Sequence, residues 1–171
     1  MAIYTAGGNT DHMILNAKSS LFTNTFSRSS NNSDFADING FNVEMTATHS
    51  SAKILLMVEL SIEGNGGQRL GFRIRAHNNS TNADEYNDFR APSAGSRTRS
   101  LASLQPGGGN QLRHLSMNVM WTPGNTNSYT YTVQCAAEGS QPQYVNRSQT
   151  DSDSHSVFRA CSSITAMEVR A

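Results

Sequence analysis

The chain has 171 residues, of which 36% are hydrophobic and 15% charged, and its 13 basic and 13 acidic residues give a formal net charge of zero. This length fits one domain with a real core, and the charge balance removes the electrostatic basis for a general binder of nucleic acid or membrane surfaces. No apolar run approaches the roughly 20 residues that cross a bilayer, and the N-terminus lacks a signal-peptide pattern. We therefore expect no nucleic-acid partner, no membrane insertion and synthesis in a cytoplasm.

The chain begins with a polar segment that has no core-forming pattern. Residues 1–11 are rich in Gly, Thr and Asn, which is typical of a flexible tail or of an arm that becomes ordered only against a partner. Residues 12–171 are expected to form one folded domain. Its first predicted strands are His12–Ala17, Leu21–Phe26 and, after a turn at Ile38-Asn39-Gly40, Phe41–Thr48.

The longest apolar run is KILLMVELSI, at Lys53–Ile62. Alternate residues on one face are aliphatic, and Leu55 and Met57 add apolar side chains on the other. A buried helix is the competing interpretation of so short a run. Turn residues bound the run on both sides, and its length is that of a strand, so a central core strand buried mainly on one side fits best.

Further strands recur along the chain with turns between them, and no stretch predicts an amphipathic helix. They are predicted over Arg69–His77, Ala94–Leu104 (weakly, at an edge), Leu115–Trp121, Ser128–Ala136, Tyr144-Val145, Val157-Phe158 and Ser162–Val169. The turn Pro123-Gly124-Asn125 predicts that the strands on either side of it pair as a β-hairpin. The pattern indicates an all-β protein, an antiparallel β-sandwich or jelly roll.

The residues with chemical potential do not form a catalytic or cofactor-binding pattern. Nothing resembles a nucleophile elbow, so no enzyme is predicted. Cys135 and Cys161 lie in strand-like stretches and are either free thiols or, if their strands are neighbours, one disulfide; their spacing does not indicate zinc. Asp151, Asp153 and His155 lie in a loop that could bind Ca²⁺, but a solvated polar loop fits better because the glycine and distal glutamate of a calcium loop are missing.

Two groups of side chains have both a functional and a structural interpretation. Arginines are concentrated in the middle of the chain, at positions 69, 73, 75, 90, 97 and 99. They predict either solvated strand faces or a docking surface for acidic glycans or an acidic subunit. Trp121, Tyr129 and Tyr131 either stack on a sugar or pack in the core or between subunits, and their alternation along strands favours packing.

Three segments carry a resemblance to a known family. They are GFNVEMT followed by SSAKILLMV within Gly40–Val58, YTYTVQ at Tyr129–Gln134, and VNRS with SSITAMEV at Val145–Ser148 and Ser162–Val169. Together they resemble small proteins and C-terminal domains of tailed bacteriophages, namely head-fibre, capsid-decoration and tail-fibre modules. The resemblance implies a trimeric jelly roll like the heads of C1q and tumour necrosis factor, which acts by binding. Because this chain lacks the shaft of longer members, a module docked directly on a shell or tail fits as well as a fibre tip.

We therefore expect a structural protein of the exterior of a tailed-phage virion, a homotrimer that docks on phage capsid or tail proteins. Outward-facing residues of core strands are the candidates for the subunit interface: Leu55, Met57, Thr165 and Met167. The N-terminal arm supplies the candidates for attachment to the virion: Ile3, Tyr4 and Thr5.

The alternative function is a carbohydrate- or receptor-binding tip module of a phage fibre. In that case a host-surface glycan would be bound by the loops Asn78–Asp88 and Pro106–Asn110, because loops on a rigid sandwich commonly carry binding residues.

Overall fold

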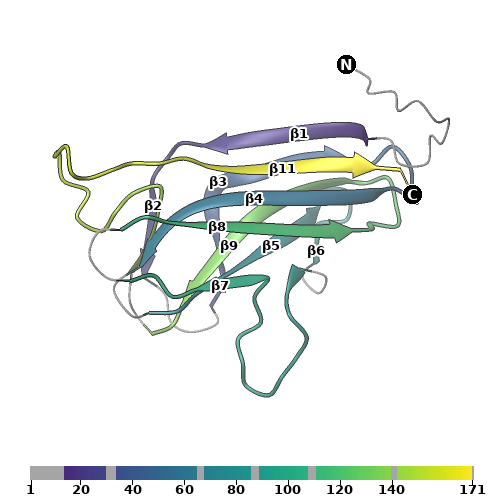
Figure 1. The fold of residues 1–171 in the computed structure, drawn as a ribbon. Coiled ribbons are helices and arrows are strands. Elements are labelled where there is room, and N and C mark those ends of the chain that lie inside the picture. The colour runs from purple at the N-terminus through teal and green to yellow at the C-terminus, as the bar shows by residue number, and fades with distance from the viewer. Residues whose placement is uncertain are drawn as a thin grey trace, which may run out of the picture.

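The computed structural model describes residues 14–29, 34–64, 68–85, 89–107, 111–139 and 142–170. These residues contain two antiparallel sheets stacked face to face (Figure 1). One sheet contains β1 (Ile14–Phe22), β11 (Ser162–Val169), β4 (Lys53–Gly64), β8 (Arg113–Trp121), β10 (Pro142–Val145) and β2 (Phe26–Ser29). The other contains β3 (Ala36–Thr46), β9 (Ser128–Ala137), β5 (Leu70–Asn78), β6 (Ala83–Glu85) and β7 (Ala102–Leu104). The predicted all-β sandwich is confirmed.

Strand β4 is the central strand of the first sheet, as the sequence predicted. It pairs with β8 along one edge and with β11 and then β10 along the other. Its inward side chains are at most 1% exposed, and they are Ile54, Leu56, Val58, Leu60 and Ile62. Full burial of one aliphatic side chain contributes roughly 1.5–3 kcal/mol, so this strand supplies a large share of the hydrophobic stabilisation.

The second sheet buries its own apolar face against the first sheet. Phe41 of β3 and Phe72 of β5 are at most 1% exposed, and the Phe41 ring stacks on Phe22 of the first sheet with centroids 5.1 Å apart. Strand β9 lies between β3 and β5 and is buried on both faces over most of its length. The core therefore fills the space between the two sheets.

The predicted hairpin of Leu115–Trp121 with Ser128–Ala136 is wrong. Strand β8 pairs with β4, whereas β9 pairs with β3 and β5 in the opposite sheet. The connection instead carries the chain across the sandwich, where Trp121 packs edge-on against Tyr129, with ring centroids 4.9 Å apart. Strand β9 is buried on both faces over most of its length, which fits its observed position between two neighbouring strands.

Three predicted boundaries are also corrected. Strand β1 continues through Phe22, so Leu21–Phe26 contains a turn and not a strand. The expected turn at Ile38-Asn39-Gly40 lies inside β3, where the register shifts between Asp37 and Asn42 and Gly40 has a φ of 81°. Such a bulge keeps Ile38 and Phe41 both buried.

The weak strands expected at Ala94–Leu104 and Val157-Phe158 are mostly loop. Only Ala102–Leu104 pairs with β5, while residues 91–100 project from the sandwich as a loop (Figure 1). At Val157 the backbone N–H donates to the Ser154 carbonyl at 3.0 Å, which forms a turn, and Phe158 is 72% exposed. Apart from Ala102–Leu104, neither stretch extends a sheet.

Asn146 joins four strands of the first sheet at a buried polar position. Its side-chain amide donates to the backbone carbonyls of Phe22 and Asn24 at 2.7 and 3.0 Å and accepts from the Ser162 hydroxyl at 2.6 Å. Its backbone N–H donates to the Ser61 carbonyl at 2.9 Å. Asn146 is 0% exposed and has a φ of 60°, a left-handed conformation that asparagine tolerates better than most residues. The turn after β1 is thereby held against β10 and β11.

We expect Asn146→Ala to lower the free energy of unfolding by about 3 kcal/mol or more, because buried carbonyls and a hydroxyl lose their partner and alanine is strained at positive φ. Asn82 has a φ of 54° but is exposed, so Asn82→Ala reports the backbone strain alone, about 1 kcal/mol. Urea denaturation of both variants measures the difference. Equal losses would contradict a specific role for the Asn146 side chain.

Candidate functional site

The outer face of the first sheet is the strongest candidate for an interaction surface. The strand register places Met120, Leu55, Met167 and Ala17 in one row across β8, β4, β11 and β1. The next row contains Met57 and Thr165, and the row on the other side contains Val169 and Ile14. We call the seven hydrophobic members the outer apolar face: Ile14, Ala17, Leu55, Met57, Met120, Met167 and Val169.

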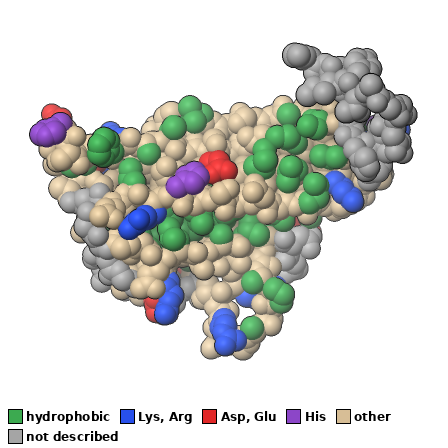
Figure 2. Space-filling view, in the orientation of Figure 1, with side chains coloured by type: hydrophobic (Ala, Val, Ile, Leu, Met, Phe, Trp, Pro, Cys, Tyr) green, Lys and Arg blue, Asp and Glu red, His purple; other side chains and the backbone are tan. Residues whose placement is uncertain are grey.

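The outer apolar face is accessible to a partner. Ile14 is 55% and Met120 49% exposed, and Leu55, Met57 and Met167 are half-buried. Figure 2 shows hydrophobic side chains gathered on this face, with a histidine and an acidic side chain next to each other beyond them. At this polar border His114 Nε2 lies 2.6 Å from Glu59 Oε2. An apolar patch with a polar rim is typical of a surface that meets another protein.

The structure brings together all four residues predicted for the subunit interface. Leu55 is directly opposite Met167, and Met57 is directly opposite Thr165, on adjacent strands. Sequence reasoning missed Met120, which lies directly opposite Leu55 on β8. Its outward position follows from the alternation of β8, but the hairpin prediction had assigned that strand the wrong neighbour. The arm residues Ile3, Tyr4 and Thr5 lie outside the described residues.

The outer face of the second sheet is polar and is internally paired. Arg75 Nη2 lies 2.6 Å from Asp37 Oδ2, and Arg75 Nη1 lies 3.2 Å from Asp84 Oδ1. The Gln134 amide donates to Asp37 at 2.7 Å and accepts from Arg73 Nε at 2.7 Å. An open cavity of about 460 Å³ lies beside this network and is lined by Arg28, Asp37 and Arg75 among others. Arg75, one of the arginines for which the sequence left open a solvated strand face or a docking surface, is therefore neutralised within its own sheet.

The aromatic side chains considered for sugar stacking belong to the core. Trp121, Tyr129 and Tyr131 are at most 6% exposed, and the Trp121 ring meets both tyrosine rings edge-on, with its centroid 4.9 and 5.9 Å from theirs. Burial, and then the neighbouring Tyr129, raises the pKa of Tyr131 above its ordinary value. The packing interpretation of these residues is the correct one.

The cysteines are both free. Cys135 lies buried in β9, and Cys161 is exposed just before β11. Burial raises the pKa of the Cys135 thiol to about 12, so at neutral pH it remains protonated and poorly nucleophilic.

The loop between β10 and β11 is closed by an aspartate and two arginines. Asp151 accepts hydrogen bonds from Arg159 Nε and Nη2 and from Arg147 Nη1, each at 3.0 Å. Asp153 and His155 are exposed. The Asp151 carboxylate thus binds guanidinium groups instead of converging with Asp153 on a cation. Among the described residues, no three His, Cys, Asp or Glu side chains group as a metal site.

The described part of the chain contains no helix that is long and apolar enough to span a membrane.

The two stacked antiparallel sheets define the class of fold, a β-sandwich of jelly-roll type, and comparison with solved structures finds chains of similar fold. The structure of infectious bursal disease virus strain Gt is similar with a TM-score of 0.50 at 12% identity, over 98% of this chain and 44% of that chain. T=1 particles derived from the same virus give a TM-score of 0.48 at 10% identity, over 99% and 41%. The chain thus spans less than half of the chains it matches. The first likeness establishes the fold, and the predicted sandwich of jelly-roll type is confirmed.

Comparison of the sequence with known protein families gives no match, and comparison with curated proteins gives none either.

We expect the Asp151 cluster to make stability depend on acidic pH. Hydrogen bonds from Arg159, and then from Arg147, hold the pKa of the Asp151 carboxyl below its ordinary value. A lowered pKa stabilises the fold above the unfolded-state value of about 3.9. That contribution is lost as the pH falls through the folded-state pKa. Asp151→Asn should therefore unfold more easily than wild type at pH 7, and the difference should shrink below about pH 4.

Urea denaturation at a series of pH values between neutral and strongly acidic measures this dependence. Asp153→Asn is the control because it removes the same charge from an exposed position two residues away. A difference between wild type and Asp151→Asn that stays constant with pH would contradict the role of the ionised carboxylate.

Proposed function

We propose that this chain is a structural protein of a virus particle and that it acts by docking to copies of itself and to other virion proteins. The observation that carries the proposal is the outer apolar face. Leu55, Met57 and Met167 lie side by side on a sheet whose opposite face already fills the core. Removing such a surface from water favours association, and the sandwich gains nothing internally from keeping it apolar.

The shared fold supports a virion role. The chain of similar fold belongs to infectious bursal disease virus, whose structure was solved as that of a virus. We assign this chain to the exterior of a tailed bacteriophage because of the resemblance carried by Gly40–Val58, Tyr129–Gln134 and the C-terminal segment. There it would decorate the capsid or form part of a head or tail fibre, and the role requires no catalytic group.

We propose a homotrimer as the assembly of this protein. A three-fold ring is built from head-to-tail contacts, so the outer apolar face of one subunit meets a different surface of the next. Leu55, Met57, Thr165 and Met167 form the centre of that contact. The Glu59 and His114 pair lies at the border of the apolar residues, where a polar rim is expected.

Light scattering at two protein concentrations tests the trimer. Wild type should have the mass of three chains at both concentrations. Met57→Glu should give a monomer, because burying an unpaired carboxylate costs several kcal/mol, about a hundredfold or more in the association constant. Thr46→Glu, at an exposed position of β3 in the opposite sheet, should remain trimeric.

A wild-type monomer at both concentrations would overturn the self-association, and equal effects of the two variants would remove the outer apolar face from it. A monomer that binds neutral host glycans on an array would favour the receptor-binding tip instead.

The N-terminal arm is proposed as the attachment to the virion, because a small polar segment without its own core orders only on a partner. A chain that lacks residues 1–11 should fold and form trimers like wild type but should be missing from purified particles. Quantitative immunoblotting of particles from infected cells measures incorporation, with alanine substitution of Ile3, Tyr4 and Thr5 as the smaller change. Normal incorporation of the shortened chain would exclude the arm as the attachment.

A further inference from the structure

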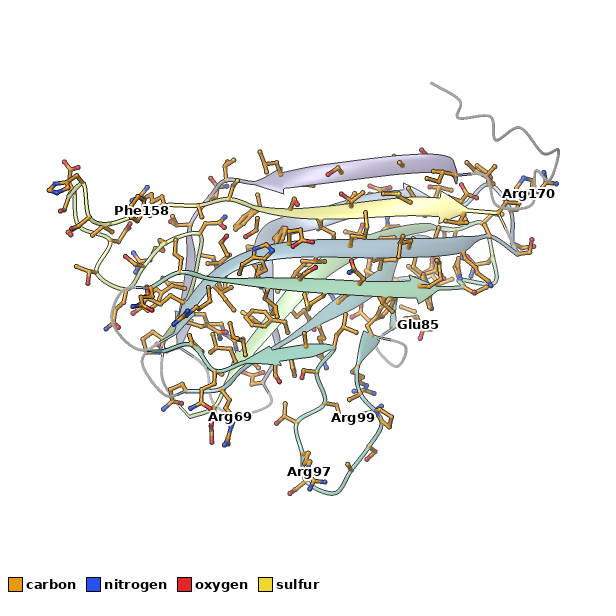
Figure 3. All side chains as sticks on the ribbon, viewed as in Figure 1. Arg69, Glu85, Arg97, Arg99, Phe158 and Arg170 are labelled. Atoms are coloured by element: carbon orange, nitrogen blue, oxygen red, sulfur yellow. The ribbon has the colours of Figure 1, made fainter. Side chains whose placement is uncertain are left out.

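A projecting loop at residues 91–100 forms a basic site that the docking function does not use. The loop leaves the sandwich between β6 and β7 (Figure 1). Its base is closed by a hydrogen bond from the Ala91 N–H to the Ser100 carbonyl at 2.9 Å. Arg99 Nε also donates to the Ala91 carbonyl, at 2.7 Å. These bonds fix the base of the loop, and Figure 3 shows Arg97 near its far end.

The segment Ser96–Thr98 separates two open cavities. One has a volume of about 290 Å³ and is also lined by Phe35, Arg73 and Arg99. The other has a volume of about 600 Å³ and is also lined by Arg69 and by hydroxyl-bearing residues of the loop and of β7. Arg97 lines both cavities. One ligand could therefore contact both sides of the loop.

The smaller cavity is lined by several basic side chains although the chain is neutral overall. Four arginines line the smaller cavity, and no carboxylate is found among the described residues that line it: Arg73, Arg90, Arg97 and Arg99. The larger cavity contains Glu138, which lies 3.5 Å from Arg69. Arg97 has an exposed side chain with no ion pair among the described residues.

Contacts within the protein hold two of these arginines in position before any ligand binds. The Arg73 guanidinium carbon lies 4.3 Å from the centroid of the Phe35 ring, and Arg73 Nε donates to Gln134 at 2.7 Å. Arg99 is held by the Ala91 carbonyl, which carries no net charge and leaves the positive charge of the guanidinium uncompensated there. Pre-positioned guanidinium groups lose little conformational entropy when they bind an anion.

We propose that these two cavities bind an acidic oligosaccharide, one that carries sulfate or carboxylate groups. Guanidinium groups bind planar carboxylates and sulfate oxygens with paired hydrogen bonds. The hydroxyls of Ser96, Thr98 and Ser100 line the same cavities and can bond to sugar hydroxyls. Nucleic acid fits less well, because Arg73 covers one face of the Phe35 ring and no other aromatic side chain among the described residues lines either cavity for base stacking.

This site differs from the loops that the sequence suggested for a glycan, and it lies on the opposite sheet from the outer apolar face. The proposal therefore does not depend on trimer formation or on incorporation into particles. If the protein is a trimer that does not bind acidic glycans, only the glycan proposal is overturned. If it is a monomer that binds them, only the trimer proposal is overturned.

Titration calorimetry of the full chain with a heparin-derived hexasaccharide and with a hexamer of galacturonic acid tests the site. Wild type should bind at least one of them, and the affinity should fall as salt is added. Arg97→Glu should weaken binding about tenfold or more, because a charge-assisted contact becomes a repulsion. Arg170→Glu, the same charge change on an exposed arginine at the end of β11 (Figure 3), should leave the affinity within about twofold of wild type.

Maltohexaose serves as the uncharged probe and a single-stranded oligonucleotide as the competing polyanion. Thermal unfolding of each variant confirms that it is folded, and Arg97→Gln gives a second, milder substitution that should weaken binding in the same direction. No binding of either acidic hexasaccharide by wild type at millimolar concentration would overturn the proposal. Equal losses in Arg97→Glu and Arg170→Glu, or tighter binding of the oligonucleotide, would overturn it too.

Discussion

Strand β4 buries five aliphatic side chains in the core and hydrogen-bonds to strands on both of its edges. The strands of the first sheet that pair with it, β8, β10 and β11, come from positions far along the chain, so β4 joins distant parts of the sequence in one sheet. The apolar face of β4 lies in the same core cluster as the apolar face of the second sheet. Much of the sandwich therefore depends on the burial of one strand face, with the hydrophobic effect as its main stabilising contribution.

Several polar side chains that are buried in the core form hydrogen bonds close to where the chain changes direction. Asn146 binds the turn after β1 and the start of β11 in one buried position. Glu168 of β11 is 0% exposed, and its Oε1 accepts from the Thr48 backbone N–H at 2.6 Å. Leaving such a buried group without a partner costs about 1–3 kcal/mol, which is more than the net stabilisation from an ordinary hydrogen bond. These contacts fix where strands end, which hydrophobic burial alone does not specify.

The outer faces of the two sheets differ in how far their side chains interact with one another within the sheet. On the second sheet Asp37, Arg75 and Gln134 bond to one another across adjacent strands, so these polar groups are paired within the sheet. On the first sheet the outer apolar face has no equivalent network. The arginines of the 91–100 loop are different again, since Arg97 and Arg99 carry charge that no described carboxylate neutralises. The proposed functions therefore belong to separate surfaces: association to the first sheet, and anion binding to the loop beside the second.

Sequence periodicity was sufficient where a strand has one apolar face. It located β4, β5 and β11 closely. It also identified the centre of the outer apolar face, because apolar side chains occupy outward positions of β4 and β11 at Leu55, Met57 and Met167, with Thr165 beside them. It did not reveal Met120 as their neighbour or the cavities beside Arg97. Both depend on which strands and loops lie next to one another, and alternation within a strand carries no information about its partner.

By itself, then, the sequence determined the fold class and which side chains face in or out, because these follow from a period of two and from turn residues. Only the tertiary structure decided the pairing: that β8 and β9 lie in different sheets, that Asn146 ends β1, and that a bulge replaces a turn at Gly40. These outcomes depend on contacts between residues distant in the chain, such as Trp121 with Tyr131 and Asn146 with Phe22. Burial and hydrogen bonding across the whole core outweighed the local turn chemistry.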